Sequence, residues 1–263
     1  MQVLPDIPYG PTPHQCVDLF LPSAPTAMVA YLHGGGFVKG SRKESTVDAL
    51  AAHLGPLGIA VAAVGYRLGG TMQQLAKPDR LAVRRMAAAS AAAGLRLSPR
   101  LYGAAFAHAV LDAGEALAAL KSGRCDTRLA GVPLVAMGMS AGGIAALSLA
   151  HPPRIWAARG ARPDAVLAVS AAMVQPWRLQ PEGPPCVMIH SAQDRIIPAD
   201  DARLADRAAK AARADLTLRI TDVRGHVPQL DWLMRGSLSD GRPALALLTD
   251  LVRGVLSGGS AKG

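Results

Sequence analysis

Short apolar runs alternate with longer alanine-rich segments along most of this chain. Runs that are apolar nearly throughout are typical of strands buried on both faces of a sheet. Strands are therefore expected at residues 27–32, 59–64, 132–137, 165–170, 186–190 and 216–220. Helices are expected at residues 44–54, 102–120, 144–150, 199–212 and 243–256. This alternation predicts an α/β fold in which helices cover both faces of a mostly parallel sheet.

Some segments depart from this alternation. Residues 15–21 alternate polar and apolar side chains, which indicates an antiparallel strand at the edge of the sheet. Residues 67–100 contain helical stretches but no strand. Because ligands bind at the carboxyl ends of parallel strands, we expect this segment to be a small helical cap inserted over a pocket, rather than an ordinary surface excursion. No linker or repeat divides the chain, so residues 1–263 are expected to form one domain with a frayed tail at 257–263.

Composition narrows the class of protein. The net charge is +9, but the basic residues are scattered and no nucleic-acid-binding motif is present, so a solvated basic surface is expected rather than a nucleic-acid site. Cys16, Cys125 and Cys186 are widely spaced and odd in number, which argues against a disulfide framework or a zinc site. No signal peptide and no apolar run of membrane-spanning length is visible, so a cytoplasmic location is expected.

One serine lies among glycines between a predicted strand and a predicted helix. The pattern is Gly138-Met139-Ser140-Ala141-Gly142, and in this context G-x-S-x-G indicates a nucleophile elbow. The turn from strand to helix is so tight that side chains two positions before and after the serine would collide with neighbouring elements. We therefore predict that Ser140 is a nucleophile at the carboxyl edge of the sheet.

A serine hydroxyl needs a base, and the base needs an orienting acid. In chains with such a nucleophile elbow, the acid and then the histidine follow the serine, each in a loop after a strand. His226, in R-G-H-V-P, is the expected base, and His190 is its closest rival. Asp194, just past the strand at 186–190, is the expected acid. Asp222 is the alternative acid, although a turn role suits it better because it lies on the same loop as His226.

A glycine run follows the predicted strand at 27–32. In His33-Gly34-Gly35-Gly36-Phe37, backbone N–H groups can approach a substrate oxygen without obstruction by side chains. The amides of Gly35, Gly36 and Ala141 are therefore the expected oxyanion-hole donors, and His33 is expected to fix the loop. A phosphate cradle is less favoured, because neither phosphate-binding glycine motif is present.

Five motifs together carry a family resemblance. They are Y-L-H-G-G-G-F, V-G-Y-R-L, G-M-S-A-G-G, D-R-I-I-P and G-H-V-P, in this order. They resemble the α/β-hydrolase superfamily, and most closely the hormone-sensitive-lipase-like carboxylesterases and their small bacterial relatives. The resemblance implies an α/β-hydrolase fold and a Ser-His-Asp hydrolase that uses no metal and no organic cofactor.

The expected activity is hydrolysis of a small-molecule carboxylic ester through an acyl-enzyme. A small or medium acyl group is expected, because the alanine-rich cap offers few aromatic walls. The same residues could support amide or formamide hydrolysis, as in kynurenine-formamidase-like relatives, or acyl transfer. A non-catalytic ligand receptor on a hydrolase scaffold is the alternative from another class. The sequence does not indicate an oligomeric state.

Overall fold

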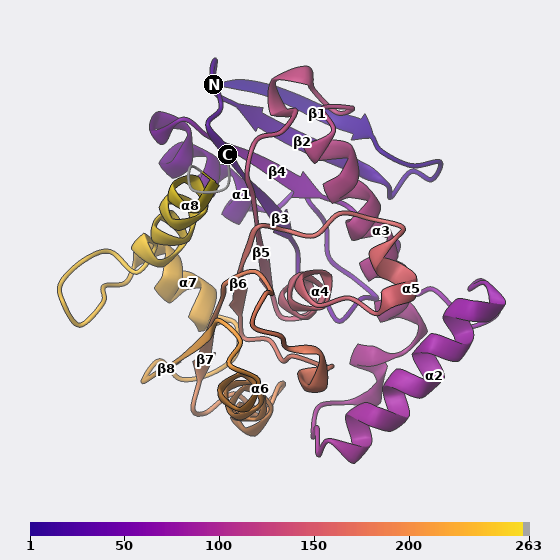
Figure 1. Cartoon of the computed structure of the whole chain (residues 1–263). Coiled ribbons are helices and arrows are strands. Elements are labelled where there is room, and N and C mark those ends of the chain that lie inside the picture. Colours follow the sequence, from indigo (N-terminus) through magenta and orange to yellow (C-terminus); the bar gives the residue numbers. More distant parts are fainter. Residues whose placement is uncertain (260–263) are drawn as a thin grey trace.

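A computed structural model describes residues 1–259 of the chain (Figure 1). An eight-stranded sheet crosses this part of the protein in the order β1-β2-β4-β3-β5-β6-β7-β8. Its strands are β1 (Gln2–Pro8), β2 (Cys16–Leu21), β3 (Ala27–Leu32), β4 (Ile59–Val64), β5 (Leu134–Met139), β6 (Ala165–Val169), β7 (Cys186–Ser191) and β8 (Leu216–Thr221). The pairs from β4 through β8 are parallel, whereas β2 runs antiparallel to both β1 and β4.

Helices lie on both sides of the sheet (Figure 1). One side carries α1 (Ser45–Leu54), α7 (Pro228–Arg235) and α8 (Ala246–Gly259). The other side carries α2 (Lys77–Ala92), α3 (Ala104–Lys121), α4 (Ala141–Ala150), α5 (Arg154–Ala157) and α6 (Ala199–Ala212). Short 3-10 helices are η1 (Gly55–Leu57), η2 (Pro99–Tyr102), η3 (Thr127–Leu129) and η4 (Pro176–Arg178).

Strand β3 shows why the central runs are apolar throughout. Met28 and Leu32 belong to the apolar cluster on the α3 and α4 side, whereas Val29 and Tyr31 belong to the cluster on the α1 and α8 side. All four side chains are at most 1% exposed. Successive side chains of a strand point to opposite faces, so a strand covered on both faces must be apolar at every position. The predicted α/β sheet with helices on both faces is confirmed.

The prediction for residues 15–21 was right in direction and wrong in position. Strand β2 is antiparallel, but β1 pairs with it and occupies the edge of the sheet. The sequence of β1, QVLPDIP, has no continuous apolar run, and most of its side chains are exposed. A strand that buries little side-chain surface leaves little hydrophobic pattern, and β1 was therefore missed.

Other element boundaries also differ from the expectation. Helix α4 begins at Ala141, directly after the serine, whereas the glycines had suggested a start at 144. The strand before it spans 134–139 rather than 132–137. Helix α7 was not expected. Helix α8 continues to Gly259, so the first part of the predicted tail is helical, and residues 260–263 lie outside the described residues.

One helical segment in the described part of the chain, Pro99–Lys121, is long and apolar enough to cross a membrane by length and composition alone. Of its most apolar window, 67% is buried inside the protein. Helix α3, which makes up most of the segment, packs against α4 and is thus a core helix of this fold.

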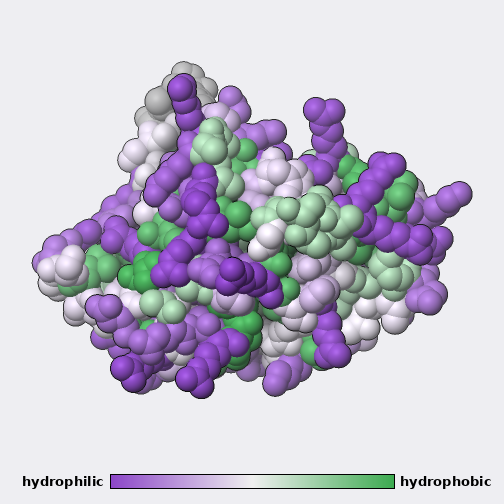
Figure 2. All heavy atoms as spheres, turned by 90° about the horizontal axis from the view of Figure 1, so that it is seen from below, coloured by the Kyte–Doolittle hydropathy of each residue, from purple (hydrophilic) through white to green (hydrophobic). Residues whose placement is uncertain are grey.

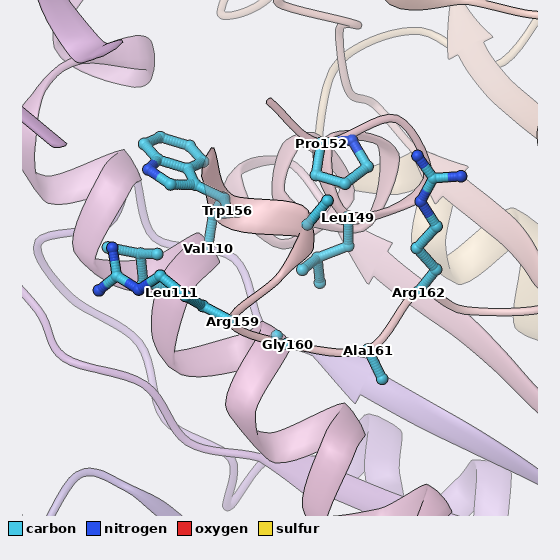
Figure 3. Close-up of a pocket in the computed structure, with 11 residues that line it drawn as sticks. Val110, Leu111, Leu149, Pro152, Trp156, Arg159, Gly160, Ala161 and Arg162 are labelled. Atoms are coloured by element: carbon cyan, nitrogen blue, oxygen red, sulfur yellow. The ribbon is translucent and has the colours of Figure 1, made fainter. Parts of the chain in front are cut away.

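The segment at 67–100 forms α2 and the approach to η2, and buried polar contacts attach it to the rest of the protein. Asp79 of α2 is 1% exposed and accepts hydrogen bonds from the Trp156 indole and the Arg159 guanidinium. Figure 3 shows these two partners, on α5 and just beyond it, around a small cavity of about 20 Å³. Near the other end of the segment, Asp201 of α6 accepts hydrogen bonds from the backbone amides of Arg96 and Leu97.

Candidate active site

Ser140 occupies the turn between β5 and α4 with a backbone conformation that is rare outside glycine. Its φ is 54° and its ψ is −120°. Its amide donates to the Val169 carbonyl at 2.8 Å, and its carbonyl accepts from the Ile144 amide at 2.9 Å. These two bonds join the sheet to the helix through a single residue, so the surrounding structure holds the strained conformation in place.

The flanking glycines are required by space, as the sequence predicted. A Cβ atom on Gly138 would overlap the backbone of Gly142. A Cβ atom on Gly142 would overlap the backbone carbonyl of Leu32 at the end of β3. Both clashes are with main-chain atoms, which cannot move aside as a flexible side chain can. The close approach of β3, β5 and α4 at this point therefore depends on both glycines.

The structure brings Ser140, Asp194 and His226 together at the carboxyl ends of β5, β7 and β8. The Ser140 Oγ lies 2.8 Å from the His226 Nε2. The His226 Nδ1 lies 2.7 Å from the Asp194 Oδ2. Each residue is 8% or 9% exposed, so the chain of hydrogen bonds is largely shielded from water while the hydroxyl stays near the surface.

The surroundings of Asp194 favour its ionised form. Burial by itself raises the pKa of this carboxyl, but the hydrogen bond from His226 and those from the Ile196 and Ile197 amides outweigh burial and lower its pKa below the ordinary value. The amide bonds go to Oδ1 at 2.8 and 3.0 Å, which leaves Oδ2 to accept from the imidazole. A carboxylate held in this way keeps a proton on Nδ1 and leaves Nε2 free to accept one.

The loop that carries His226 is held by residues that the sequence analysis missed. The Ser170 Oγ donates to the His226 carbonyl at 2.8 Å. The Ser191 Oγ and the Gln229 Nε2 each donate to the Val223 carbonyl at 2.7 Å. Serine and glutamine in these positions carry no motif, so only their approach to the loop in space reveals their function.

Neither alternative residue joins the hydrogen-bonded chain of Ser140, His226 and Asp194. His190 is fully buried, and its Nε2 donates to the Ile197 carbonyl at 2.9 Å. Burial lowers the pKa of His190, so this imidazole is neutral where it passes 3.5 Å from the Asp194 Oδ2. His190 is thus a packed residue at a strand end, as expected. Across residues 1–259, Asp222 makes no hydrogen bond to His226.

The glycine loop after β3 passes close to the serine. A Cβ atom on Gly34 would lie 3.6 Å from the Ser140 Cβ. Gly35 and Gly36 have φ values of 110° and 65°, and within the described residues their amides donate to no acceptor. Ala141 is the first residue of α4, where backbone N–H groups have no partner inside the helix. Gly35, Gly36 and Ala141 thus have amides without a backbone partner in the described residues, and their role as oxyanion-hole donors stays a prediction.

His33 and Tyr66 fix the glycine loop from behind. The Tyr66 hydroxyl donates to the His33 carbonyl at 2.6 Å, and the two rings stack with their centroids 4.2 Å apart. The His33 Nδ1 lies 2.7 Å from the Gly34 carbonyl, to which it can donate. Both side chains are buried, as expected for a structural pair.

Two features border this site. A cavity of about 610 Å³ adjoins Asp194 and His226, and Arg195, Ile196 and Arg224 also line it. Leu101 of η2 lies beside the glycine loop, because a Cβ atom on Gly36 would lie 3.9 Å from its Cδ2. Helix η2 thus approaches the candidate oxyanion loop. In the described part of the chain, no group of three or more His, Cys, Asp or Glu side chains is placed to hold a metal ion.

No protein-family model matches this sequence, and no curated protein matches it. Solved structures do resemble it. A truncated carbohydrate esterase from gut microbiota superposes with a TM-score of 0.70 at 12% identity, over 98% of this chain and 97% of that one. Thermogutta terrifontis esterase 2 with butyrate bound gives 0.66 at 16% identity, over 97% and 94%. The same esterase phosphonylated by cyclosarin gives 0.62 at 17% identity, over 86% and 83%.

The chain has the α/β-hydrolase fold. The structural similarity extends over nearly the whole of both chains in the first two cases. Because the sequence identities are low, the similarity establishes the fold alone. The function has to be argued from the site, and the hormone-sensitive-lipase-like subgroup stays a prediction.

Proposed function

We propose that this protein is a serine hydrolase that cleaves carboxylic esters. One observation carries the proposal: the Ser140 Oγ, the His226 ring and the Asp194 carboxylate form a continuous hydrogen-bonded chain with separations of 2.8 and 2.7 Å. This is the arrangement that turns a weakly nucleophilic hydroxyl into an attacking group.

Each group has a role in the proposed reaction. The Ser140 Oγ attacks the ester carbonyl while the His226 Nε2 accepts its proton and then passes it to the departing alcohol. Asp194 orients the imidazole and stabilises its cation. The amides of Gly35, Gly36 and Ala141 bind the oxygen that becomes negative in the tetrahedral intermediate. A water molecule activated by His226 then releases the acid from the acyl-enzyme.

A small or medium acyl group is proposed for the substrate. Leu101 stands beside Gly36, so η2 limits the room next to the proposed oxyanion hole. The similar Thermogutta terrifontis esterase 2 has been solved with butyrate and with propionate bound. It has also been solved after phosphonylation by sarin and by cyclosarin. These likenesses support a short-chain ester and a serine nucleophile for this chain.

The test compares Ser140→Ala with Ser239→Ala, a substitution in an exposed turn. On p-nitrophenyl butyrate, Ser140→Ala is expected to lower kcat/KM at least about 10³-fold, because the nucleophile is removed, and Ser239→Ala is expected to leave it unchanged. A fluorophosphonate should add to Ser140 of the unmodified protein, as mapped by mass spectrometry. Equal turnover by both variants would overturn the proposal.

A second comparison separates ester from amide hydrolysis. The two substrates are p-nitrophenyl butyrate and the p-nitroanilide of butyric acid. They share the acyl group and the nitrophenyl ring and differ in whether an ester or an amide bond is cleaved. We expect the ester to be turned over faster by a margin well above the difference in their uncatalysed rates. A larger catalytic acceleration on the anilide would reassign the protein to the amidases while keeping Ser140 as its nucleophile.

A further inference from the structure

A second cavity lies away from the serine, between α2, α5 and η4. Its volume is about 500 Å³, which is within the usual range for a small-molecule site. None of the residues of the hydrogen-bonded chain lines it. Figure 2 views the molecule from below, and on its right, where α2 lies, hydrophilic and hydrophobic side chains are interspersed. The residues that line the cavity are likewise a mixture of polar and apolar side chains.

A buried amide without partners belongs to this wall. Gln175 is 0% exposed, and within residues 1–259 neither its Oε1 nor its Nε2 has a hydrogen-bond partner. The Nε of Arg178 is also buried without a partner. Buried polar groups in folded proteins are nearly always paired, so this amide keeps unused hydrogen-bonding capacity at the wall of the cavity.

The charges of the lining are all of one sign. Arg85, Arg154 and Arg178 line the cavity, and no carboxylate does. None of these arginines forms an ion pair within the described part of the chain. Burial and the nearby charge of Arg154 both lower the pKa of Arg178, so these two guanidinium groups repel each other. An anion placed between them would relieve that repulsion and accept hydrogen bonds from both.

Three large apolar side chains of the lining are exposed to solvent. Leu81 of α2 is 48% exposed, Ile155 of α5 is 39% exposed and Trp177 of η4 is 45% exposed. Single exposed apolar side chains are ordinary, but these three come from separate elements and meet around one cavity. They provide a surface on which a short hydrocarbon chain or a ring can pack.

We propose that this cavity binds a small organic anion with an apolar body, such as a medium-chain carboxylate. The Arg154 and Arg178 guanidinium groups hold its charged head, the Gln175 amide donates to it, and Leu81, Ile155 and Trp177 pack against its hydrocarbon part. The site is separate from Ser140, and it does not depend on the proposed ester hydrolysis.

The experiment uses octanoate as the probe and the full-length protein. Isothermal titration is expected to show saturable binding with a Kd below about 1 mM, accompanied by a change in Trp177 fluorescence that is lost in Trp177→Phe. Octanol, which has the same body without the charge, and acetate, which has the charge without the body, are expected to bind at least about tenfold more weakly.

Two arginine variants locate the binding. Arg154→Gln should weaken octanoate binding at least about tenfold, because it removes one guanidinium from the head-group position. Arg195→Gln removes a guanidinium beside Asp194 and His226 instead, and it should leave the affinity unchanged. The opposite pattern would place octanoate at the serine site and overturn the proposal, as would the absence of saturable binding.

A third variant separates a ligand site from an ordinary buried water. Gln175→Leu replaces the unpaired amide by an apolar side chain of similar size, so the protein should fold at least as stably. Octanoate affinity should nevertheless fall at least about tenfold, because the hydrogen bond from the amide to the charged carboxylate is lost. An unchanged affinity in a stably folded Gln175→Leu protein would contradict the proposed role of the amide.

Discussion

Two serines hold positive φ angles at the carboxyl ends of neighbouring strands. Ser140 follows β5 with φ 54°, and Ser170 follows β6 with φ 49°. Each still donates its amide to the next strand, to Val169 and Ile189 respectively, at 2.8 Å, while the chain turns away. One presents the proposed nucleophile, and the other holds the backbone of His226. Local strain at two adjacent strand ends thus sets the distance between hydroxyl and imidazole.

The glycine after the serine is predicted to tolerate no side chain. Gly142→Ala should lower the free energy of unfolding by about 1–3 kcal/mol, because the new Cβ would overlap the Leu32 carbonyl. Gly254→Ala is the matched control, since Gly254 lies in α8 with open space around its Cβ position. There, alanine should raise helix stability by up to about 1 kcal/mol. Urea denaturation measures both, and equal effects would contradict the steric argument.

Asp194 is predicted to make the protein more stable at neutral than at acid pH. Although burial alone would raise its pKa, the hydrogen bonds from His226 and two amides lower the folded-state pKa below its ordinary value. This contribution to stability is therefore present above the unfolded pKa, about 3.9, and is lost as the pH falls through the lower folded value.

Asp194→Asn removes this titration. The free energy of unfolding, measured by urea denaturation between about pH 5 and pH 3, should fall less steeply in Asp194→Asn than in the unmodified protein. Asp231→Asn, on the exposed part of α7, should follow the unmodified protein. Identical slopes for all three proteins would show that Asp194 is not stabilised by folding.

Helix α2 packs Val83 and Met86 into the core, and polar contacts distant in sequence also attach it to the protein. Its Asp79 joins α5 through Trp156 and Arg159, and the Ser90 Oγ donates to the Val174 carbonyl at 2.7 Å. The same segment continues to η2, whose Leu101 lies beside Gly36. The cap expected at 67–100 stays a prediction, and these contacts define what would have to break for it to move.

Loss of the Asp79 carboxylate is predicted to loosen α2. Asp79→Ala leaves the Trp156 indole N–H and the Arg159 charge without their acceptor, so the free energy of unfolding should fall by about 1–3 kcal/mol. Asp206→Ala removes only a surface pair with Lys210 and should cost less than about 0.5 kcal/mol. Amide exchange in α2 should accelerate in the first variant alone. Unchanged exchange there would show that α2 is held by other contacts.

The sheet divides the whole molecule into two apolar clusters, one on each face. All three cysteines are free: Cys16 and Cys125 are partly buried, and Cys186 on β7 is buried. The fold therefore depends on packing against the sheet rather than on covalent cross-links. Burial raises the pKa of the Cys186 thiol to about 12, which keeps it in the unreactive protonated form.

Cys186 is therefore predicted to report global unfolding. Iodoacetamide at about pH 8 should leave Cys186 unmodified in the native protein, because the thiolate is scarce and the sulfur is buried. In urea above the unfolding transition all three thiols should react, as mapped by mass spectrometry. Rapid native labelling of Cys186 would mean that β7 opens without global unfolding.

The sequence by itself determined the central strands, the fold class and the residues that meet at the sheet edge. A strand buried on both faces must be apolar at every position, so its pattern is local and visible. The chemistry of an elbow also requires small residues at fixed spacing from Ser140, and the order of strands requires Asp194 and His226 to follow in separate loops.

Only the tertiary structure decided the features that depend on distant partners. Strand β1 forms because β2 offers it an unpaired edge, although its own side chains are mostly exposed. Ser170 supports His226 because two loops 56 residues apart approach each other. The unpaired amide of Gln175 becomes a candidate ligand-binding group only because residues of α2 and α5 line the same cavity. Such contacts leave no periodic signal in the chain, because each is made by single residues that other parts of the fold bring together.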